Sequence, residues 1–230
     1  MPKENRMRKN NSQETIQRIL DAAIGLFKEK GFDKTSMQDI VVASQMSKGA
    51  IFHHFRSKEE VFETAMAQEY AFTRDLFDAF LGQLTGMTAK EKMQRLLVAN
   101  FEGEEEPMTA DAQELIDMAA SSPHLMLADM RRNISDIAPI VTRLIDEGIG
   151  DGSISTAYPQ ELGEVFILLY NHWANTHPFD ADVETLRRRV KFLQYMMGSL
   201  GCDIVTDQIV EYNIAAMEKY KQAQEGATSQ

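Results

Sequence analysis

Cysteine is almost absent from this chain of 230 residues, in which Cys202 is the only one. A single cysteine cannot form an internal disulfide or a thiolate metal cage, and the simplest home for such a chain is a reducing cytoplasm. Long apolar runs are missing as well, and without a stretch of about 18 apolar residues a membrane span is not expected. The N-terminus is polar and basic and lacks the apolar core of a secretory signal. We therefore expect a cytoplasmic protein without a membrane partner.

Signatures of catalysis are also missing. The sequence has no glycine-rich phosphate loop, no His-Glu-x-x-His motif and no nucleophile elbow. His172 and His177 lie too far apart to share one helix face, so a histidine metal site is not expected. The acidic run at residues 102–106 is expected to be a solvated loop rather than a cation site. We expect no enzymatic activity, no cofactor and no metal, and a helical enzyme built on residues 170–173 is a rival interpretation.

Helical periodicity is what the sequence contains along almost its whole length. Ile16, Leu20, Ala23 and Phe27 fall on one apolar stripe, and Gly31 follows them as a helix stop. Because no convincing strand pattern occurs, we predict an all-α fold of about nine to ten helices. Helices are expected to begin near Ser36, Ser47, Ser57 and Thr88, to run through Glu114 and Met118, and to cover residues 124–147 with a bend near Pro139, 159–176, 182–198 and 206–222.

Charge divides the chain into two parts. Residues 1–60 hold 11 Lys and Arg against 8 Asp and Glu, whereas the rest of the chain holds 13 against 27. This asymmetry indicates a basic binding domain joined to an acidic body that would repel nucleic acid. We predict an N-terminal domain at residues 1–60, a connecting helix at 61–82 and a C-terminal helical body at 83–225.

Residues 36–55 predict two short helices joined by a tight bend, which is the geometry of a helix-turn-helix motif. On a helical wheel of the second helix, Ile51 faces inward. Two aromatic rings, a glycine and a cation on the outside of so short a helix need an explanation, and a DNA groove supplies one. The cation would meet a base edge or a phosphate, the glycine would allow close approach, and the rings would meet sugar, phosphate or a thymine methyl. The outward residues are Lys48, Gly49, Phe52 and His53.

Residues 12–60 resemble the N-terminal domain of the TetR family of transcriptional regulators. The matching stretches are Ile19-Leu-Asp-Ala-Ala-Ile-Gly-Leu-Phe, Gly31-Phe-Asp-Lys-Thr-Ser-Met-Gln-Asp-Ile and Ser47-Lys-Gly-Ala-Ile-Phe-His-His-Phe-Arg-Ser-Lys-Glu-Glu. The resemblance implies DNA contacts from Lys48, Gly49, Ala50, Phe52, His53 and His54, and from Lys58, Thr35, Ser36 and Gln38. Phe52, His54 and Lys58 would contact phosphate rather than a base edge. For His54, partial burial remains an equal alternative to DNA contact.

Two positions in this region raise structural questions. Gln45 stands in the turn where the family usually has glycine. It must either adopt a left-handed backbone, at a cost of about 1 kcal/mol, or change the shape of the turn. Lys58 lies at the start of the following helix, where its charge opposes the helix dipole, and a nearby phosphate is expected to compensate for that charge.

Two amphipathic helices near the C-terminus are expected to close a four-helix bundle with a second copy of the chain. The segments Tyr170-Asn-His-Trp-Ala-Asn-Thr-His-Pro-Phe and Leu186-Arg-Arg-Arg-Val-Lys-Phe-Leu resemble the helices through which TetR-like proteins dimerise. The alternative is that their apolar stripes form only the core of one subunit. The expected interface residues are Leu162, Val165, Leu169, Leu186, Val190, Leu193 and Met197.

Methionine is frequent in the middle helices, and its flexible thioether suits an adaptable apolar cavity. The family resemblance implies that a small-molecule effector of unknown identity binds among these helices. For each candidate the alternative is a place in the ordinary core. The candidate lining residues are Met93, Leu97, Phe101, Met118, Met126, Met130, Phe166, Tyr170 and Trp173.

These patterns and the resemblance together predict a homodimeric bacterial transcriptional regulator with sequence-specific binding to double-stranded DNA. We expect a repressor whose two reading helices engage a palindromic operator and which a small-molecule effector releases. The alternative is a ligand-binding or scaffold protein with a vestigial DNA-binding head.

Overall fold

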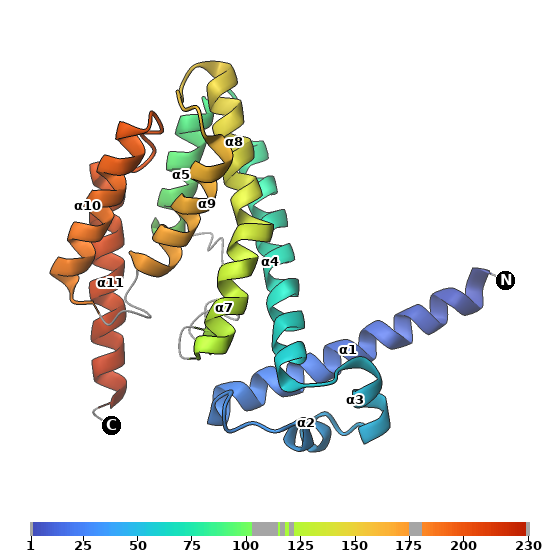
Figure 1. The fold of residues 1–230 in the computed structure, drawn as a ribbon. Coiled ribbons are helices and arrows are strands. Elements are labelled where there is room, and N and C mark those ends of the chain that lie inside the picture. Colours follow the sequence, from blue (N-terminus) through green and yellow to red (C-terminus); the bar gives the residue numbers. More distant parts are fainter. Residues whose placement is uncertain (1, 103–114, 116–117, 120–121, 175–180, 229–230) are drawn as a thin grey trace. The chain divides into compact units, whose positions relative to one another are not determined.

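The computed structural model describes residues 2–102, 115, 118–119, 122–174 and 181–228, and every regular element in these ranges is a helix (Figure 1). The all-α fold predicted from the sequence is therefore confirmed. Of the helix expected through Glu114 and Met118, only residues 115, 118 and 119 are described, and they are helical, while most of the acidic run at 102–106 lies outside the described residues. None of the described helices is both long enough and apolar enough to cross a bilayer.

The chain forms two compact units, each of which is described by itself. The first comes from the described parts of Met1–Glu69 and Asp111–Ala128, and the second from those of Tyr70–Ala110 and Asp129–Gln230. The division after Glu69 falls inside one helix, within the stretch 61–82 for which a connecting helix is expected.

The first unit contains a three-helix head, formed by α1 (Pro2–Lys30), α2 (Met37–Ser44) and α3 (Lys48–His54), and the start of α4 (Lys58–Gln83). The apolar stripe of α1 points inward as its periodicity predicts, with Leu20 fully buried and Phe27 2% exposed. The ring of Phe27 lies 5.1 Å from that of Phe32 and 6.2 Å from that of Phe62, between centroids. This aromatic cluster joins α1, the turn that follows it and α4.

Local caps determine where the helices of the head begin and end. Gly31 has a φ of 86°, which glycine adopts without strain, and its N–H donates to Phe27 O at 3.0 Å. At the start of α2, the N–H of Asp39 donates to Ser36 Oγ at 3.2 Å, and the N–H of Ser36 donates to Asp39 Oδ2 at 2.8 Å. The side chain of Asp39 also pairs with Lys30 at 2.7 Å. These contacts confirm the helix start predicted at Ser36.

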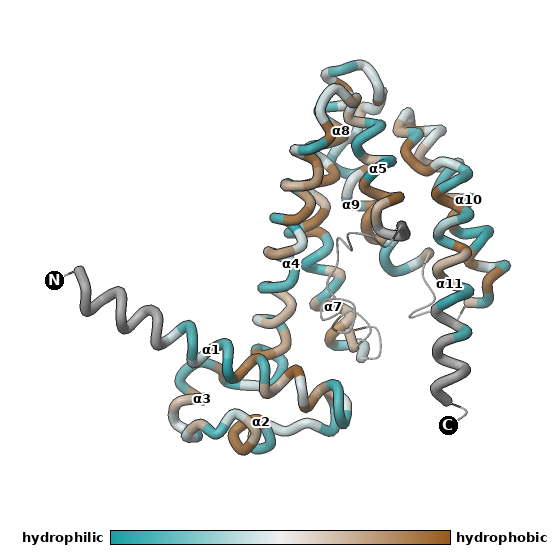
Figure 2. Tube along the Cα trace, turned by 180° about the vertical axis from the view of Figure 1, so that it is seen from behind, coloured by the Kyte–Doolittle hydropathy of each residue, from teal (hydrophilic) through white to brown (hydrophobic). Residues whose placement is uncertain are grey.

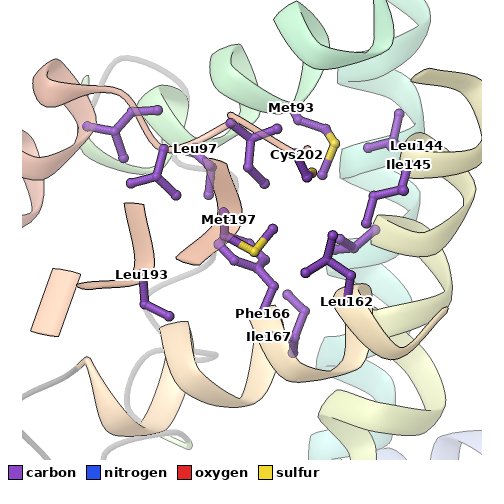
Figure 3. Close-up of a cluster of buried hydrophobic side chains, with 14 of the residues drawn as sticks. Met93, Leu97, Leu144, Ile145, Leu162, Phe166, Ile167, Leu193, Met197 and Cys202 are labelled. Atoms are coloured by element: carbon purple, nitrogen blue, oxygen red, sulfur yellow. The ribbon is translucent and has the colours of Figure 1, made fainter. Parts of the chain in front are cut away.

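The second unit contains the rest of α4 together with α5 (Ala89–Glu102), α8 (Ala138–Asp151), α9 (Pro159–Leu168), α10 (Val183–Ser199) and α11 (Asp207–Thr228), and α7 (Pro123–Arg132) ends in it. Apolar side chains from several of these helices converge on one core, and Figure 3 shows Met93, Leu144, Phe166 and Met197 pointing into it. Apolar residues recur among polar ones along the helices of both units (Figure 2), as is typical of amphipathic helices.

Two π-helical turns occur in the second unit where the sequence predicts continuous helices. The first, η1 (Asn133–Ile137), separates α7 from α8, and the second, η2 (Leu169–Trp173), continues α9. Pro139 cannot donate a backbone hydrogen bond and its ring crowds the preceding turn, so the predicted bend takes the form of a wider turn just before it. The N–H of Ala174 closes η2 by donating to Leu169 O at 2.7 Å. Such turns are rare and frequently lie at functional sites.

Candidate nucleic-acid interface

Helix α3 is held in place by a cap at one end and by a buried side chain at its centre. Ser47 caps the helix, because its Oγ accepts from the N–H of Ala50 at 3.2 Å. Ile51 is fully buried, and Phe55, just beyond the end of the helix, is 4% exposed. The inward position of Ile51 predicted from the wheel is confirmed. These anchors fix which side of α3 faces outward.

The outward side of α3 exposes a cation and two aromatic rings. Lys48, Gly49 and His53 are exposed, and Phe52 is 42% exposed. The Lys48 ammonium lies 5.6 Å from the centroid of the Phe52 ring, and the His53 ring lies 5.1 Å from that of His54, edge to face. His54 is half-buried, so both alternatives for it remain. The face offers a charge, hydrogen-bond donors and flat apolar rings, which is the set that a DNA groove can use.

Gly49 leaves open space on this face. A Cβ at position 49 would have no atom within 4 Å. The packing of the head therefore does not require glycine there, and an alanine would form a helix better. A residue that the fold does not need is free to serve the close approach of a partner.

The turn between α2 and α3 keeps the left-handed backbone that glycine would adopt. Gln45 has φ 56° and ψ 32°, and it is the one non-glycine residue with a positive φ in the described part of the chain. Its N–H donates to Val42 O at 3.2 Å and closes α2. Of the two alternatives for Gln45, the strained backbone at about 1 kcal/mol is the one adopted.

Three expected contacts before α3 have different surroundings. Thr35 is 2% exposed, and its hydroxyl lies 2.8 Å from Gly31 O, to which it donates. Its side chain caps the end of α1, and the DNA contact expected from this residue stays a prediction. Ser36 is exposed but its hydroxyl donates to Asp39 at 2.7 Å, whereas Gln38 is exposed.

Lys58 has partners inside the head. Its ammonium donates to Phe32 O at 2.8 Å and to Asp33 O at 3.1 Å, and it lies 4.4 Å from the centroid of the Phe32 ring. These carbonyls compensate a charge that opposes the dipole of α4. The charge of Lys58 is therefore compensated within the head, and the phosphate contact expected of this residue stays a prediction.

The candidate pocket residues divide between the two units. Met93, Leu97 and Phe166 belong to the core of the second unit, which is the alternative stated for them. Tyr170 stacks on Phe166 with 5.3 Å between centroids, its hydroxyl accepts from Asn213 at 3.1 Å, and burial raises its pKa to about 12. The other candidates are a half-buried Met130 and Trp173 in the second unit, Met118 and Met126 in the first, and Phe101, whose side chain lies outside the described residues.

Most of the expected dimer residues face the core of their own subunit. Leu162 is 4% exposed, and Leu186, Val190, Leu193 and Met197 are fully buried. These five residues lie in the core of their own subunit, which is the alternative stated for their apolar stripes. Val165 is 42% exposed and Leu169 is half-buried. The outward side of α10 instead exposes Phe192 by 50% and Tyr195 by 71%.

A buried polar cluster in the second unit is the feature that the sequence reasoning missed. It joins Tyr70, Asp129, Asn133 and His172. The available signal was a polar pair at helical spacing, Asp129 and Asn133, on an otherwise apolar side. Among the described residues, no three or more His, Cys, Asp or Glu side chains gather in a way that could hold a metal ion.

Comparisons with known proteins agree with this geometry. Residues 19–65 match the family model for bacterial regulatory proteins, tetR family. The chain is 42% identical over 57 residues to the HTH-type transcriptional regulator AcrR of Shigella flexneri, a match that spans 25% of this chain and only 26% of AcrR. It is 24% identical over 153 residues to the HTH-type transcriptional repressor KstR2 of Rhodococcus jostii (strain RHA1), covering 65% of this chain and 72% of that one. The solved structure of Salmonella enterica GusR has the same fold, with a TM-score of 0.54 at 21% identity, over 82% of this chain and 96% of that chain.

Proposed function

Because this chain belongs to the TetR family of bacterial regulators, we propose that it is a sequence-specific DNA-binding repressor that a small-molecule effector releases from a palindromic operator. The observation that carries the proposal is the outward side of α3, where Lys48, Phe52 and His53 are exposed around an anchored Ile51. At an exposed site the contact between Lys48 and Phe52 stabilises the head only slightly, whereas a groove would bury both side chains.

The head reads DNA by placing α3 in the major groove. Lys48 binds a guanine edge or a phosphate, and Phe52 packs against sugar or a thymine methyl. Gly49 lets the backbone of α3 approach the DNA, since nothing in the head occupies the space beside it. The acidic charge that opposes DNA binding lies beyond residue 60, and it restricts contact to the head.

A second copy of the chain pairs through the outward sides of α9 and α10. On α10 this side exposes Arg188, Lys191, Phe192 and Tyr195, and on α9 it exposes Glu161 and Val165. A two-fold axis sets α10 of one copy against α9 of the other, so the basic and acidic residues meet and the aromatic rings are buried. The dimer then presents two reading helices to half-sites about one DNA turn apart, roughly 34 Å.

Effector release is a matter of linkage. A ligand that binds more tightly to a conformation with misplaced reading helices must weaken DNA binding by the same coupling energy. Helix α4 runs without interruption from the head into the second unit, so it can transmit a change in the second unit to the head. In this role the protein works in the cytoplasm, where the DNA is.

The experiment is a footprint of the purified protein on the DNA upstream of its own gene. The proposal expects one protected palindrome that competitor DNA without the site does not displace. Uniform or absent protection over that region and over the neighbouring promoters would instead favour a vestigial head. The same footprint with the Lys48→Ala variant serves as the negative control.

A further inference from the structure

A buried polar cluster lies in the second unit, and the proposed function gives it no role. Its side chains come from four elements: Tyr70 from α4, Asp129 from α7, Asn133 from η1 and His172 from η2. Asp129 is 6% exposed, Asn133 1% and His172 7%. Polar groups buried this deeply are costly unless they are paired, so their hydrogen bonds decide what the cluster can do.

Asn133 is the donor at the centre of the cluster. Its Nδ2 lies 3.1 Å from Tyr70 Oη, 3.3 Å from Asp129 Oδ2, 3.0 Å from the carbonyl oxygen of Asp129 and 3.4 Å from His172 Nε2. The orientation of this amide is fixed by Asn171, whose Nδ2 donates to Asn133 Oδ1 at 2.6 Å. An amide nitrogen can only donate, so a hydrogen bond between Asn133 and His172 requires a neutral imidazole that carries its proton on Nδ1 and accepts at Nε2.

Asp129 accepts at both of its carboxylate oxygens. The hydroxyl of Tyr70 donates to Oδ1, and Asn133 donates to Oδ2. Oδ2 also lies 3.6 Å from His172 Nε2, which is beyond a normal hydrogen bond. The carboxylate and the imidazole are therefore neighbours that share the donor Asn133 and do not yet bond to each other.

A proton on His172 reverses the chemistry at Nε2. The nitrogen becomes a donor, so it can no longer accept from Asn133, and two donors face each other at 3.4 Å. The acceptor beside it is Asp129 Oδ2, and the imidazole must move towards that oxygen to bond to it. Protonation thus exchanges a contact with η1 for a contact with α7.

We propose that Asn133, Asp129 and His172 form an acid-operated clasp, in which the imidazole of η2 contacts Asn133 of η1 while it is neutral and moves to Asp129 of α7 when it is protonated, while the bond from Asn171 keeps η2 beside η1 in both states. Both elements that carry the contact are π-helical turns: η1 separates α7 from α8, and η2 continues α9. Such turns frequently lie at functional sites. The clasp goes beyond the proposed function, because it concerns the second unit alone and needs neither DNA nor effector.

The electrostatic surroundings favour the neutral imidazole. Burial lowers the pKa of His172, and the opposing charge of Asp129 is the smaller effect. Burial also raises the pKa of Asp129, although the hydrogen bond from Tyr70 and the charges of His172 and Arg132 act the other way. Both directions resist an ion pair in this site.

Other charged groups near the clasp have partners of their own. Arg132 of α7 pairs with Asp136 of η1 at 3.5 Å, and Arg189 of α10 donates to Trp173 O at 2.8 Å. Burial raises the pKa of Tyr70 well above its usual range, with the charge of Asp129 adding to the effect. Tyr70 therefore stays protonated, which leaves His172 and Asp129 as the groups of the cluster that can take up a proton in acid.

The sign of the pH effect follows from the lowered pKa of His172. The unfolded chain takes up a proton near pH 6.5, the ordinary histidine value, whereas the folded clasp resists it. The contribution of the clasp to stability is therefore present above that pH and is lost as the pH falls. One histidine can change the unfolding constant by at most about tenfold per pH unit.

The test compares denaturant unfolding from pH 8 to pH 5 for the wild type, His172→Gln and His124→Gln. Glutamine at position 172 can still accept from Asn133 but does not titrate, and His124 is an exposed histidine outside the clasp. The wild type and His124→Gln should lose stability below about pH 6.5. His172→Gln should lose several-fold less over the same range. Equal pH dependence in all three proteins would overturn the clasp.

A second measurement needs no variant. In the ¹⁵N spectrum of the wild-type imidazoles, His172 should show a proton on Nδ1 and a bare Nε2 at neutral pH. Its resonances should shift at a lower pH than those of a histidine in an unfolded chain, together with the amide signals of η1. A proton on Nε2 at neutral pH, or titration without any change in η1, would contradict the proposal even if His172→Gln failed to fold.

Discussion

The head and the body of this protein differ in what their helical stripes leave exposed. In the head, Ile51 is buried and Lys48, Phe52 and His53 remain outside, so the residues proposed to contact DNA are ones that the core of the head does not use. In the second unit, the apolar stripes that were expected to meet a second copy are buried in the core of the same subunit. The outward side of α10 exposes Phe192 and Tyr195 instead. An apolar stripe in the sequence therefore predicts which residues are buried. Whether another helix of the same subunit or a second copy buries them follows only from the packing.

The largest predicted effect separates two residues of α10 that are two positions apart. Leu193→Ala removes a fully buried side chain and should lower the free energy of unfolding by about 2–5 kcal/mol. Tyr195→Ala removes a side chain that is 71% exposed, so it should leave the fold of the monomer intact and weaken the dimer. Denaturant unfolding and sedimentation measure the two quantities. A dimer that survives Tyr195→Ala and Phe192→Ala together would place the interface elsewhere.

The next effect separates the two lysines of the head that were expected to meet DNA. Lys58→Met keeps the aliphatic stem over Phe32 but removes the ammonium that donates to Phe32 O and Asp33 O. It should destabilise the protein by about 1–3 kcal/mol, since two charge-assisted hydrogen bonds are lost. Thermal unfolding tests it. If stability is unchanged and only operator affinity falls, Lys58 serves DNA and not the head.

The turn between the two helices of the motif carries a smaller effect. Gln45→Gly removes the strain of a left-handed backbone and should stabilise the protein by about 1 kcal/mol, reduced by the greater freedom of glycine in the unfolded chain. Gln45→Ala, which keeps the strain, is the matched control. A Gln45→Gly variant that is less stable than Gln45→Ala would mean that the strain at position 45 is smaller than the entropic cost of glycine.

The smallest stability effect comes with a functional cost. Gly49→Ala places a methyl group in open space within a helix and should stabilise the protein by about 0.5–1 kcal/mol. The same methyl group should weaken operator binding, because it stands between α3 and the DNA. Gly25→Ala, in α1 and equally open, is the control that should stabilise without changing affinity. Unchanged operator affinity in Gly49→Ala would show that DNA binding does not require the backbone of α3 to approach the DNA closely at position 49.

Local signals made the head predictable and left the body incomplete. The cap formed by Ser36 and Asp39 and the inward turn of Ile51 depend on neighbours three or four residues away, so the sequence displays them. The sequence did not show that the hydroxyl of Thr35 turns back to the end of α1. His172 and Asp129 are 43 positions apart, and only the packing of α7 against the wide turn η2 brings them within 3.6 Å. Such pairings depend on tertiary contacts that no periodicity records.

Operator affinity over a range of salt concentrations, measured for the wild type and for Lys48→Ala, tests most directly whether α3 reads DNA. Lys219→Ala, an exposed lysine of α11, makes the same change of charge away from the head. If α3 reads DNA, Lys48→Ala should weaken the binding of the operator by about 1–3 kcal/mol. Lys219→Ala should have the operator affinity and the salt slope of the wild type. Equal affinity and an equal salt slope for all three proteins would contradict that role of α3.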